Sequence, residues 1–377
     1  ILFGTNQANN QPIMWYPNDT DKVFHTNTGI IGTMGTGKTQ FTKSLITQLY
    51  REGKHNLEGK DLGILIFDYK GDYNKTKQDF IDATNAKVYE LYHLPFNPLS
   101  IIKTEHPKPM LPLQIASSLK ETLAKGFGLG VIQANLLKDL IMEAYEAKGI
   151  IKNNPDTWDR VPPTLQDVYN RYIDREDLKQ DSLYAAFSNL IEFEIFEPDA
   201  TKTQPLFDLL DGVTVIDLSG YDEGTQNLVV AVTLDLFYSQ MQSVGHSKID
   251  KNIRQLTKLI LVDEADNFLS KDFNALKKIL KEGREFGVGT ILSTQLLSHF
   301  STSDNDYANY ILTWVVHNVA DLNTRDVKYI FNTKTKQQEE ELYNKIKSLE
   351  KHYSLVKMGD SDRPLHVRDK AFWELDK

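Results

Sequence analysis

The sequence predicts an α/β fold in which a mostly parallel central sheet is flanked by helices. A glycine-rich loop over 32–39 lies between a short β-prone run and a segment with helical spacing. Short apolar runs alternate with helical segments towards both ends of the chain, which is typical of a parallel sheet covered on both faces. Between about residues 105 and 200 the pattern is helical throughout, which predicts an all-helical insertion.

The glycine-rich loop reads Gly32-Thr33-Met34-Gly35-Thr36-Gly37-Lys38-Thr39 and matches the pattern G-x-x-x-x-G-K-[ST] at every fixed position. Its glycines let successive backbone N–H groups point into one concavity, which holds phosphates together with the N-terminus of the next helix. Lys38 can reach the β- and γ-phosphates, and the Thr39 hydroxyl can ligate Mg²⁺. We therefore expect this loop, together with Gln40, to bind a nucleoside triphosphate and Mg²⁺.

Seven apolar runs are the expected strands, at 28–31, 62–67, 87–91, 213–218, 259–262, 290–294 and 311–316. A highly charged segment at 333–352 predicts an exposed helix whose narrow apolar stripe includes Tyr353 at its end. The expected organisation is a strand-and-turn lead-in over 1–25, an ATPase-like core over 26–104 and 203–377, and the helical insertion over 105–202.

Two acidic residues, Asp263 and Glu264, directly follow the apolar run 259–262. A strand that ends in this way delivers carboxylates to Mg²⁺, and we expect Asp263 to hold the metal through water. Glu264 beside it can polarise an attacking water molecule as a general base. This pair favours a hydrolase over a kinase, because a kinase must exclude water. Since no Asn-Lys-x-Asp guanine motif follows a strand, ATP is favoured over GTP.

Gln295 and Arg284 are further candidates. Gln295 follows the run 290–294, at the sheet edge where phosphate chemistry occurs, and its amide can hydrogen-bond the γ-phosphate or the attacking water. The alternative is a glutamine that begins a loop. Arg284 follows a helical segment, and it either complements the helix C-terminus or serves as an arginine finger for a neighbouring subunit.

Composition bounds the class of protein. The net charge of −9 and the isoelectric point of about 5.6 give no overall basic signature of nucleic-acid binding. The absence of cysteine excludes disulfides and cysteine-based zinc sites. No apolar run approaches 18 residues and no signal peptide is present, so we expect a cytosolic protein without a membrane segment. Because the chain opens on Ile1, we expect it to be part of a longer protein.

Taken together, the motifs resemble the HerA/FtsK superfamily of RecA-like P-loop ATPases, which includes conjugative coupling proteins and VirB4-type ATPases. Those that carry the resemblance are, in order, Gly32–Thr39, Asp68-x-Lys70-Gly71-Asp72, Asn97-Pro98-Leu99, Asp263-Glu264, Gly283-Arg284 and Thr294-Gln295. Within the superfamily, the runs from His25 to Thr39 and from Phe67 to Tyr73 look most similar to the HerA-like ATPase of DNA phosphorothioation-dependent restriction systems, the DptH type.

The resemblance implies a homohexamer with ATP and Mg²⁺ at subunit interfaces, double-stranded DNA in the pore and other defence-system proteins as partners. Its implied site residues are Lys38 and Thr39 for nucleotide and Mg²⁺, Asp263 and Glu264 for hydrolysis, Gln295 as the γ-phosphate sensor, and Arg284 in trans. Asp72 stands where family members often carry Glu, so it keeps the charge but loses reach. Asp68 and Asp72 are therefore either site residues or loop acids at a strand end.

The leading hypothesis is an ATP-hydrolysing DNA translocase. A VirB4-like secretion or protein-remodelling ATPase is the alternative, and the acidic charge fits it slightly better. The third hypothesis is a nucleotide-gated assembly scaffold, a protein that binds ATP to assemble a complex and hydrolyses it slowly.

Overall fold

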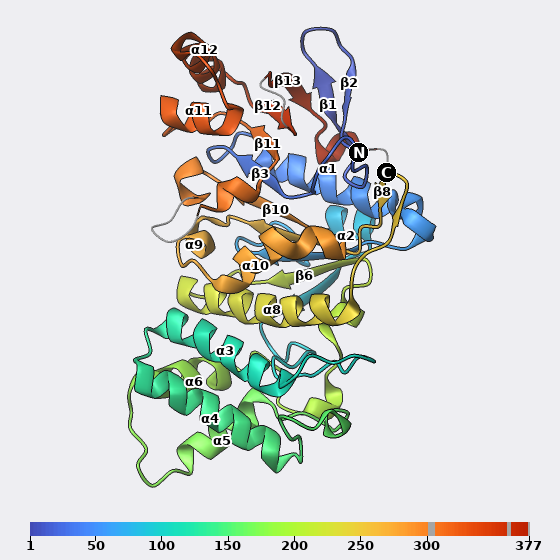
Figure 1. Ribbon diagram of the computed structural model, residues 1–377. Coiled ribbons are helices and arrows are strands. Elements are labelled where there is room, and N and C mark those ends of the chain that lie inside the picture. Colours follow the sequence, from blue (N-terminus) through green and yellow to red (C-terminus); the bar gives the residue numbers. More distant parts are fainter. Residues whose placement is uncertain (301–305, 360–362, 376–377) are drawn as a thin grey trace.

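A single large sheet, covered by helices, forms the centre of the computed structural model, which describes residues 1–300, 306–359 and 363–375 (Figure 1). In this part of the chain the sheet has eleven strands in the order β2-β1-β13-β12-β11-β3-β10-β9-β4-β6-β5. Their bounds are β1 Leu2–Asn6, β2 Pro12–Met14, β3 Thr28–Ile31, β4 Gly63–Asp68, β5 Lys87–Glu90, β6 Val213–Asp217, β9 Lys258–Asp263, β10 Val288–Thr294, β11 Thr313–Val316, β12 Tyr353–Met358 and β13 Leu365–Asp369.

The seven expected strands are the seven strands from β11 to β5, and all of them run parallel. Every residue of β3, β4, β10 and β11 is buried, which explains why these strands read as continuous apolar runs. The α/β fold with a mostly parallel sheet is therefore confirmed.

Four antiparallel strands extend the sheet beyond β11, in the order β12, β13, β1 and β2. The lead-in over 1–25 thus contributes β1 and β2 to the main sheet. The expectation of one helix over 333–352 is corrected, because α12 spans Lys336–Lys347 and Tyr353 begins β12 instead of lying on the helix. Ser348 ends α12, and its backbone N–H closes the last helical turn.

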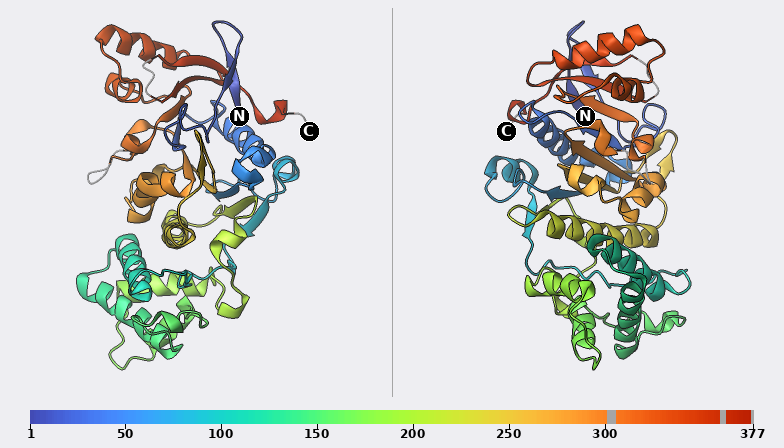
Figure 2. Two further views of the ribbon diagram at one scale, coloured as in Figure 1. Left: turned by 45° about the vertical axis from the view of Figure 1, so that its right-hand side comes forward. Right: turned by 90° about the vertical axis from the view of Figure 1, so that its left-hand side faces the viewer.

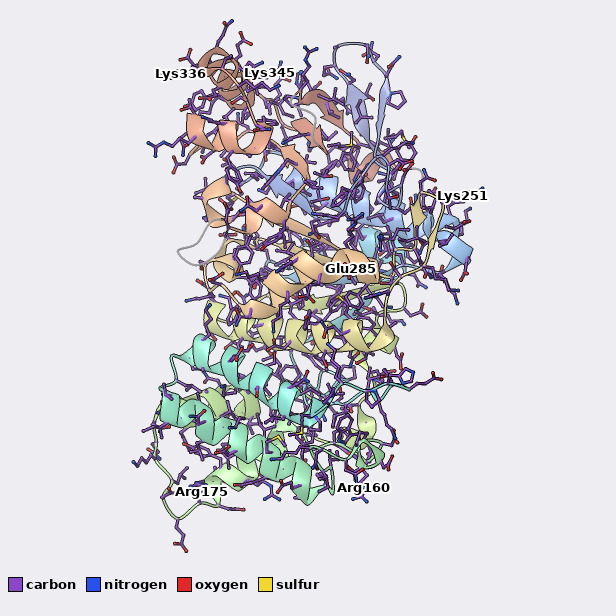
Figure 3. The ribbon with its side chains drawn as sticks, viewed as in Figure 1. Arg160, Arg175, Lys251, Glu285, Lys336 and Lys345 are labelled. Atoms are coloured by element: carbon purple, nitrogen blue, oxygen red, sulfur yellow. The ribbon has the colours of Figure 1, made fainter. Side chains whose placement is uncertain are left out.

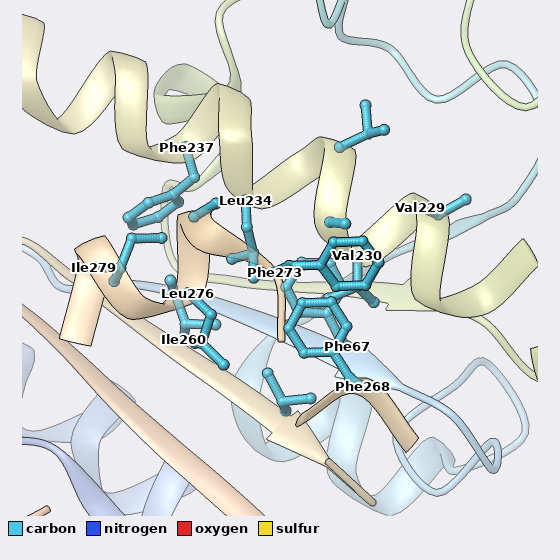
Figure 4. Close-up of a cluster of buried hydrophobic side chains, with 14 of the residues drawn as sticks. Phe67, Val229, Val230, Leu234, Phe237, Ile260, Phe268, Phe273, Leu276 and Ile279 are labelled. Atoms are coloured by element: carbon cyan, nitrogen blue, oxygen red, sulfur yellow. The ribbon is translucent and has the colours of Figure 1, made fainter. Parts of the chain in front are cut away.

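Side chains of successive strand residues point to opposite faces and join two separate cores. Ile64 and Ile66 of β4 pack with α1 (Lys38–Arg51) and α2 (Gln78–Thr84) on one face. Leu65 and Phe67 face the other core, which α8 (Glu223–Val244), α9 (Asp266–Leu269) and α10 (Asn274–Glu282) complete (Figure 4). Helix α11 spans Thr324–Phe331.

Helix α8 is buried over most of its length because it lies between the sheet and a group of further helices. These helices are α3 Leu111–Phe127, α4 Val131–Ala147, α5 Leu165–Ile173, α6 Ser182–Glu192 and α7 Leu206–Leu209. Figure 2 shows the same layering from two further directions. The core on this side of the sheet continues through α3, α4 and α6, so the helical region packs directly on the α/β part.

A half-buried carboxyl group lies at the contact between α3 and α8. The hydroxyl groups of Ser118 and Thr122, one turn apart on α3, both donate to Asp235 of α8. Asp235 lines a cavity of about 210 Å³, and burial raises its pKa to about 7. The folded protein therefore holds a proton on Asp235 far more tightly than the unfolded chain does.

This difference predicts a pH-dependent stability. The contribution of Asp235 to stability is complete below pH 4 and is lost as the pH rises to about 7, the pKa of the folded state. Asp235→Asn should remove this dependence, so its free energy of unfolding relative to wild type should rise by up to about 1.4 kcal/mol per pH unit between pH 5 and 7. Urea unfolding at pH 5, 6, 7 and 8 measures the effect. The same substitution at the exposed Asp139 is the control, and parallel pH profiles for both variants would contradict the prediction.

Candidate nucleotide site

The glycine-rich loop begins directly after β3 and ends where α1 starts at Lys38, so the expected strand, loop and helix are all present. Gly35 and Gly37 have φ angles of 83° and 110°, a region that residues with a side chain rarely adopt. The backbone thus turns sharply at both glycines, as a phosphate-cradling loop requires.

Segments that follow β11 and precede β12 hold this loop in place. The backbone N–H of Thr33 donates to the Asn318 carbonyl at 2.8 Å, and the Thr33 hydroxyl accepts from the Ala320 N–H at 2.7 Å. The Thr36 carbonyl accepts from the His352 N–H at 2.9 Å. A Cβ atom at Gly37 would lie only 2.5 Å from Nδ1 of His352, so the close approach itself requires glycine.

A buried polar group supports the loop from behind. His317 follows β11, and its Nε2 lies 2.9 Å from Oδ2 of Asp369, the last residue of β13. The Ser354 hydroxyl donates to the other carboxylate oxygen at 2.5 Å. Cβ of His317 would lie 2.7 Å from a Cβ atom at Gly32. No sequence motif marks these residues, which were missed because they come from three separate strands.

The Lys38 ammonium lies inside the loop, where it donates to the carbonyl groups of Gly32 and Thr33. Burial lowers its pKa, and the charges of Glu264 and Asp263 oppose that shift. Phosphate oxygens at this position would compete with the two carbonyl groups for the same charged donor.

Three acids form a row at the carboxyl ends of neighbouring strands. The strand register pairs Asp68 of β4 with Asp263 of β9 on one side and with Asp217 of β6 on the other. Asp263 is buried, and burial raises its pKa to about 6. A group of three acidic or imidazole side chains that could hold a metal alone does not occur in the described residues. The donor set of Asp263 and Thr39 suits Mg²⁺, which is usually bound by one or two protein ligands, nucleotide phosphates and water.

Asp68 shapes the next loop. Its carboxylate accepts the backbone N–H groups of Gly71, Asp72 and Tyr73 at 2.8 to 2.9 Å. Both carboxylate oxygens are thereby engaged by the loop backbone, which favours the interpretation of Asp68 as a loop acid. Asp72 is half-buried, and its negative charge adds to the effect of burial that raises the pKa of Asp263. The Tyr73 hydroxyl lies 2.5 Å from that of Thr42 and ties this loop to α1.

Glu264 has a left-handed backbone with φ 56°, which costs about 1–2 kcal/mol in a residue other than glycine. Its carboxylate contacts Lys70 at 2.7 Å and accepts from the Gln295 amide at 3.1 Å. Burial alone would raise the pKa of Glu264, but Lys70 and Gln295 outweigh burial and hold it below its usual range. Glu264 is therefore ionised at neutral pH, as a general base must be. Lys70 had been noted only as part of a motif, because its pairing depends on the fold.

Gln40 follows Thr39 in the first turn of α1. Its side-chain oxygen Oε1 is buried and has no hydrogen-bond partner in the described part of the chain. Thr39 itself is partly buried, and its carbonyl accepts from the Thr42 hydroxyl at 3.1 Å. Both residues thus lie at the helix N-terminus that closes the loop.

Arg284 lies at the opposite edge of the sheet from the other candidates. It belongs to the short 3₁₀ helix Gly283–Phe286, which precedes β10, whereas Gln295 follows β10. A strand of this length spans about 20 Å. Helix α9 follows the carboxyl end of β9 in the chain and lies on the left in Figure 1, whereas β8 (Ile253–Arg254), which precedes β9, lies on the right. Figure 3 labels Glu285, the neighbour of Arg284, near the right-hand end of α10. The structure therefore brings Lys38, Asp263, Glu264 and Gln295 together and separates Arg284 from them.

Comparison with known proteins places this chain in a family. The family model described as "Helicase HerA, central domain" matches residues 13–237. The chain belongs to this family. No curated protein sequence matches it significantly. In the described part of the chain, none of the helices has the length and apolarity needed to cross a membrane.

Solved structures share the fold of this HerA-family chain. VirB4 of Thermoanaerobacter pseudethanolicus has a TM-score of 0.74 at 14% identity, over 98% of this chain and 96% of that one. The plasmid coupling protein TrwB with a non-hydrolysable ATP analogue has a TM-score of 0.59 at 13% identity, over 92% and 85%. TrwB with ADP and Mg²⁺ gives 0.56 at 12% identity, over 92% and 85%. The family and the fold together make the chain a P-loop ATPase of the HerA type.

The contact between Gly37 and His352 generates a prediction about nucleotide affinity. Gly35→Ala should weaken ADP binding about tenfold, because the left-handed backbone costs alanine ~1–2 kcal/mol. Gly37→Ala should lose at least about a further tenfold, because its methyl group would also collide with the His352 ring. Titration calorimetry with Mg-ADP measures both variants. His352→Ala in the Gly37→Ala background should recover part of the difference, and equal affinities for the two single variants would refute the steric argument.

Proposed function

We propose that the chain is an ATP-hydrolysing motor, a hexameric DNA translocase of the DptH type in a DNA restriction or defence system. The observation that carries this proposal is the division of the site between two sheet edges. Groups for binding and for water activation lie at one edge, and Arg284 lies about 20 Å away at the other. A subunit with this arrangement needs a neighbour to complete its site.

The contacts described above support hydrolysis at the sheet edge that carries the glycine-rich loop. The backbone of the loop over 32–39 and Lys38 bind the phosphates, and Thr39 and Asp263 provide ligands for Mg²⁺. When bound, Mg²⁺ neutralises charge that develops on the phosphate oxygens. Glu264, kept ionised by Lys70, accepts a proton from the attacking water. Gln295 contacts Glu264 directly, so it orients the same water and senses the γ-phosphate.

Assembly follows from the position of Arg284. Its guanidinium group makes no hydrogen bond in the described part of the chain and stacks 3.6 Å from the centre of the Phe24 ring. An arginine supplied in trans is worth ~10³–10⁵ in rate, which would make turnover depend on ring formation. The ring size of six comes from the resemblance to HerA/FtsK ATPases.

The moved polymer is double-stranded DNA in this proposal. The net charge of −9 favours a polypeptide slightly, which keeps the VirB4-like secretion or remodelling ATPase as the second candidate. A ring that encloses DNA needs positive charge only at its pore, so the overall charge does not decide between the two. A test of whether duplex DNA stimulates the ATPase rate distinguishes the two candidates.

We expect duplex DNA to raise the ATPase rate several-fold, and this stimulation to fall steeply between about 50 and 200 mM salt.

Glu264→Gln should lower kcat by about 10²–10⁴ while leaving ADP affinity intact, because it removes the general base alone. Lys38→Ala should abolish both binding and turnover. Steady-state ATPase assays with and without DNA, alongside solution mass, measure these outcomes. An unchanged rate with DNA of every length and at every salt concentration would reject the DNA motor and favour a polypeptide substrate.

Mixed rings test the action of Arg284 in trans. Neither Arg284→Ala nor Lys38→Ala subunits should turn over alone. In a 1:1 mixture, about a quarter of the interfaces pair an intact Lys38 with an intact Arg284 across a head-to-tail contact, so ATPase activity should return in part. Fluorescence energy transfer between labelled subunits confirms that the rings mix. Mixed rings that remain inactive would reject the trans assignment.

A further inference from the structure

A second arginine accompanies Arg284 at the sheet edge opposite the glycine-rich loop. Arg254 ends β8 (Ile253–Arg254), which pairs with β7 (Ile249–Asp250) in a small hairpin. Its Nη1 donates to the Arg284 carbonyl at 3.0 Å and to the Ser247 hydroxyl at 3.3 Å. The hairpin therefore holds one guanidinium group against the backbone that carries the other.

Neither guanidinium group has the acidic partner that a partly buried arginine normally has. The Nε atom of each is buried without a hydrogen-bond partner, and neither group lies within ion-pair distance of a carboxylate in the described residues. Glu285 is the acid nearest in sequence, and it contacts His246 instead. An unsatisfied buried donor costs about 1–3 kcal/mol, more when it is charged, so this cluster is costly unless an anion completes it.

The local potential at the cluster is positive. Burial and the charge of Arg284 together lower the pKa of Arg254. The same two causes lower the pKa of His25 to about 4, so its imidazole is neutral at pH 7. Glu285 offsets only part of this charge at Arg254. Two like charges held together without a counter-ion are the arrangement that a phosphate group stabilises.

The shape of the cluster indicates how the phosphate arrives. The recess that His25, Arg254 and Arg284 line holds only about 10 Å³, so a nucleotide cannot enter it. Phe24 is 59% exposed and supports the Arg284 guanidinium through a cation–π contact, which leaves the cluster at the surface. A ligand presented by another protein surface fits this geometry, whereas a free nucleotide in a pocket does not.

We propose that Arg254 is a second phosphate-binding residue, which acts beside Arg284 on the nucleotide held by a neighbouring subunit. This inference rests on the proposed function and extends it from one arginine to a pair. Arg254 then does two things. It positions the Arg284 backbone through Nη1, and its remaining donors contact phosphate oxygens whose charge increases during hydrolysis.

The test separates the charge of Arg254 from its support of Arg284. Arg254→Gln keeps a hydrogen-bond donor for the Arg284 carbonyl but removes the positive charge. We expect it to lower kcat by about 10- to 100-fold, the effect of losing a charged hydrogen bond, with KM for ATP unchanged. The control is Arg160→Ala, because Arg160 also donates Nη1 to a backbone carbonyl, that of Gly149, but lies in the helical region (Figure 3). This control should keep wild-type turnover.

A double variant supplies the second measurement. Arg254→Gln should also reduce kcat at least about fivefold in the Arg284→Lys background, where Arg284 no longer provides its guanidinium group. Wild-type kcat for Arg254→Gln would overturn the inference, and so would the absence of any further loss in the double variant. Partial recovery in rings that mix Arg284→Ala with Lys38→Ala would still support the proposed function in either case. If those mixed rings are inactive, the proposed function itself fails.

Discussion

The parallel register of β3, β10, β9 and β4 is the constraint on which the site depends. It places Asp68 beside Asp263 and Thr294 beside Ile31, so the glycine-rich loop, the acids and Gln295 all emerge at one edge. A slip of one residue would turn every side chain of a strand to the other face and exchange the two cores. Because these strands are buried on both faces, the packing that stabilises the sheet also fixes the geometry of the site.

The antiparallel strands carry none of the candidate catalytic groups, yet they determine how the loop is held. His352 and Asp369 lie at the ends of β12 and β13, and His317 follows β11, the last parallel strand. These three residues contact the loop or each other behind it. Their hydrogen bonds restrain a backbone that glycine alone would leave flexible. The phosphate-binding loop is thus supported on both sides, by α1 and by the segments at the ends of β11, β12 and β13.

Local sequence patterns were sufficient to predict the parallel strands and the candidate residues at the edge that carries the glycine-rich loop. An apolar run that ends in Asp263-Glu264 predicts both a buried strand and carboxylates placed at its end. The motif at 32–39 predicts a phosphate-binding loop between a strand and a helix. The contacts that distinguish similar acids were not predictable, because they depend on tertiary structure. No pattern shows that Asp68 is used by three backbone N–H groups while Glu264 pairs with Lys70. Strands β12 and β13 escaped prediction because they are partly exposed and lack a continuous apolar run.

Strand β10 connects the two sheet edges at which Gln295 and Arg284 lie. Gln295 follows its last residue, Arg284 precedes its first by four positions, and hydrogen bonds to β3 and β9 restrain it on both sides. A strand held in this way does not stretch, so a displacement at one end moves the other end with it. With Arg284 in a neighbour's site, each β10 would act as a rigid rod between two nucleotides. Hydrolysis at one site would then change the geometry of the next site, and the subunits of a ring would hydrolyse ATP in a fixed order.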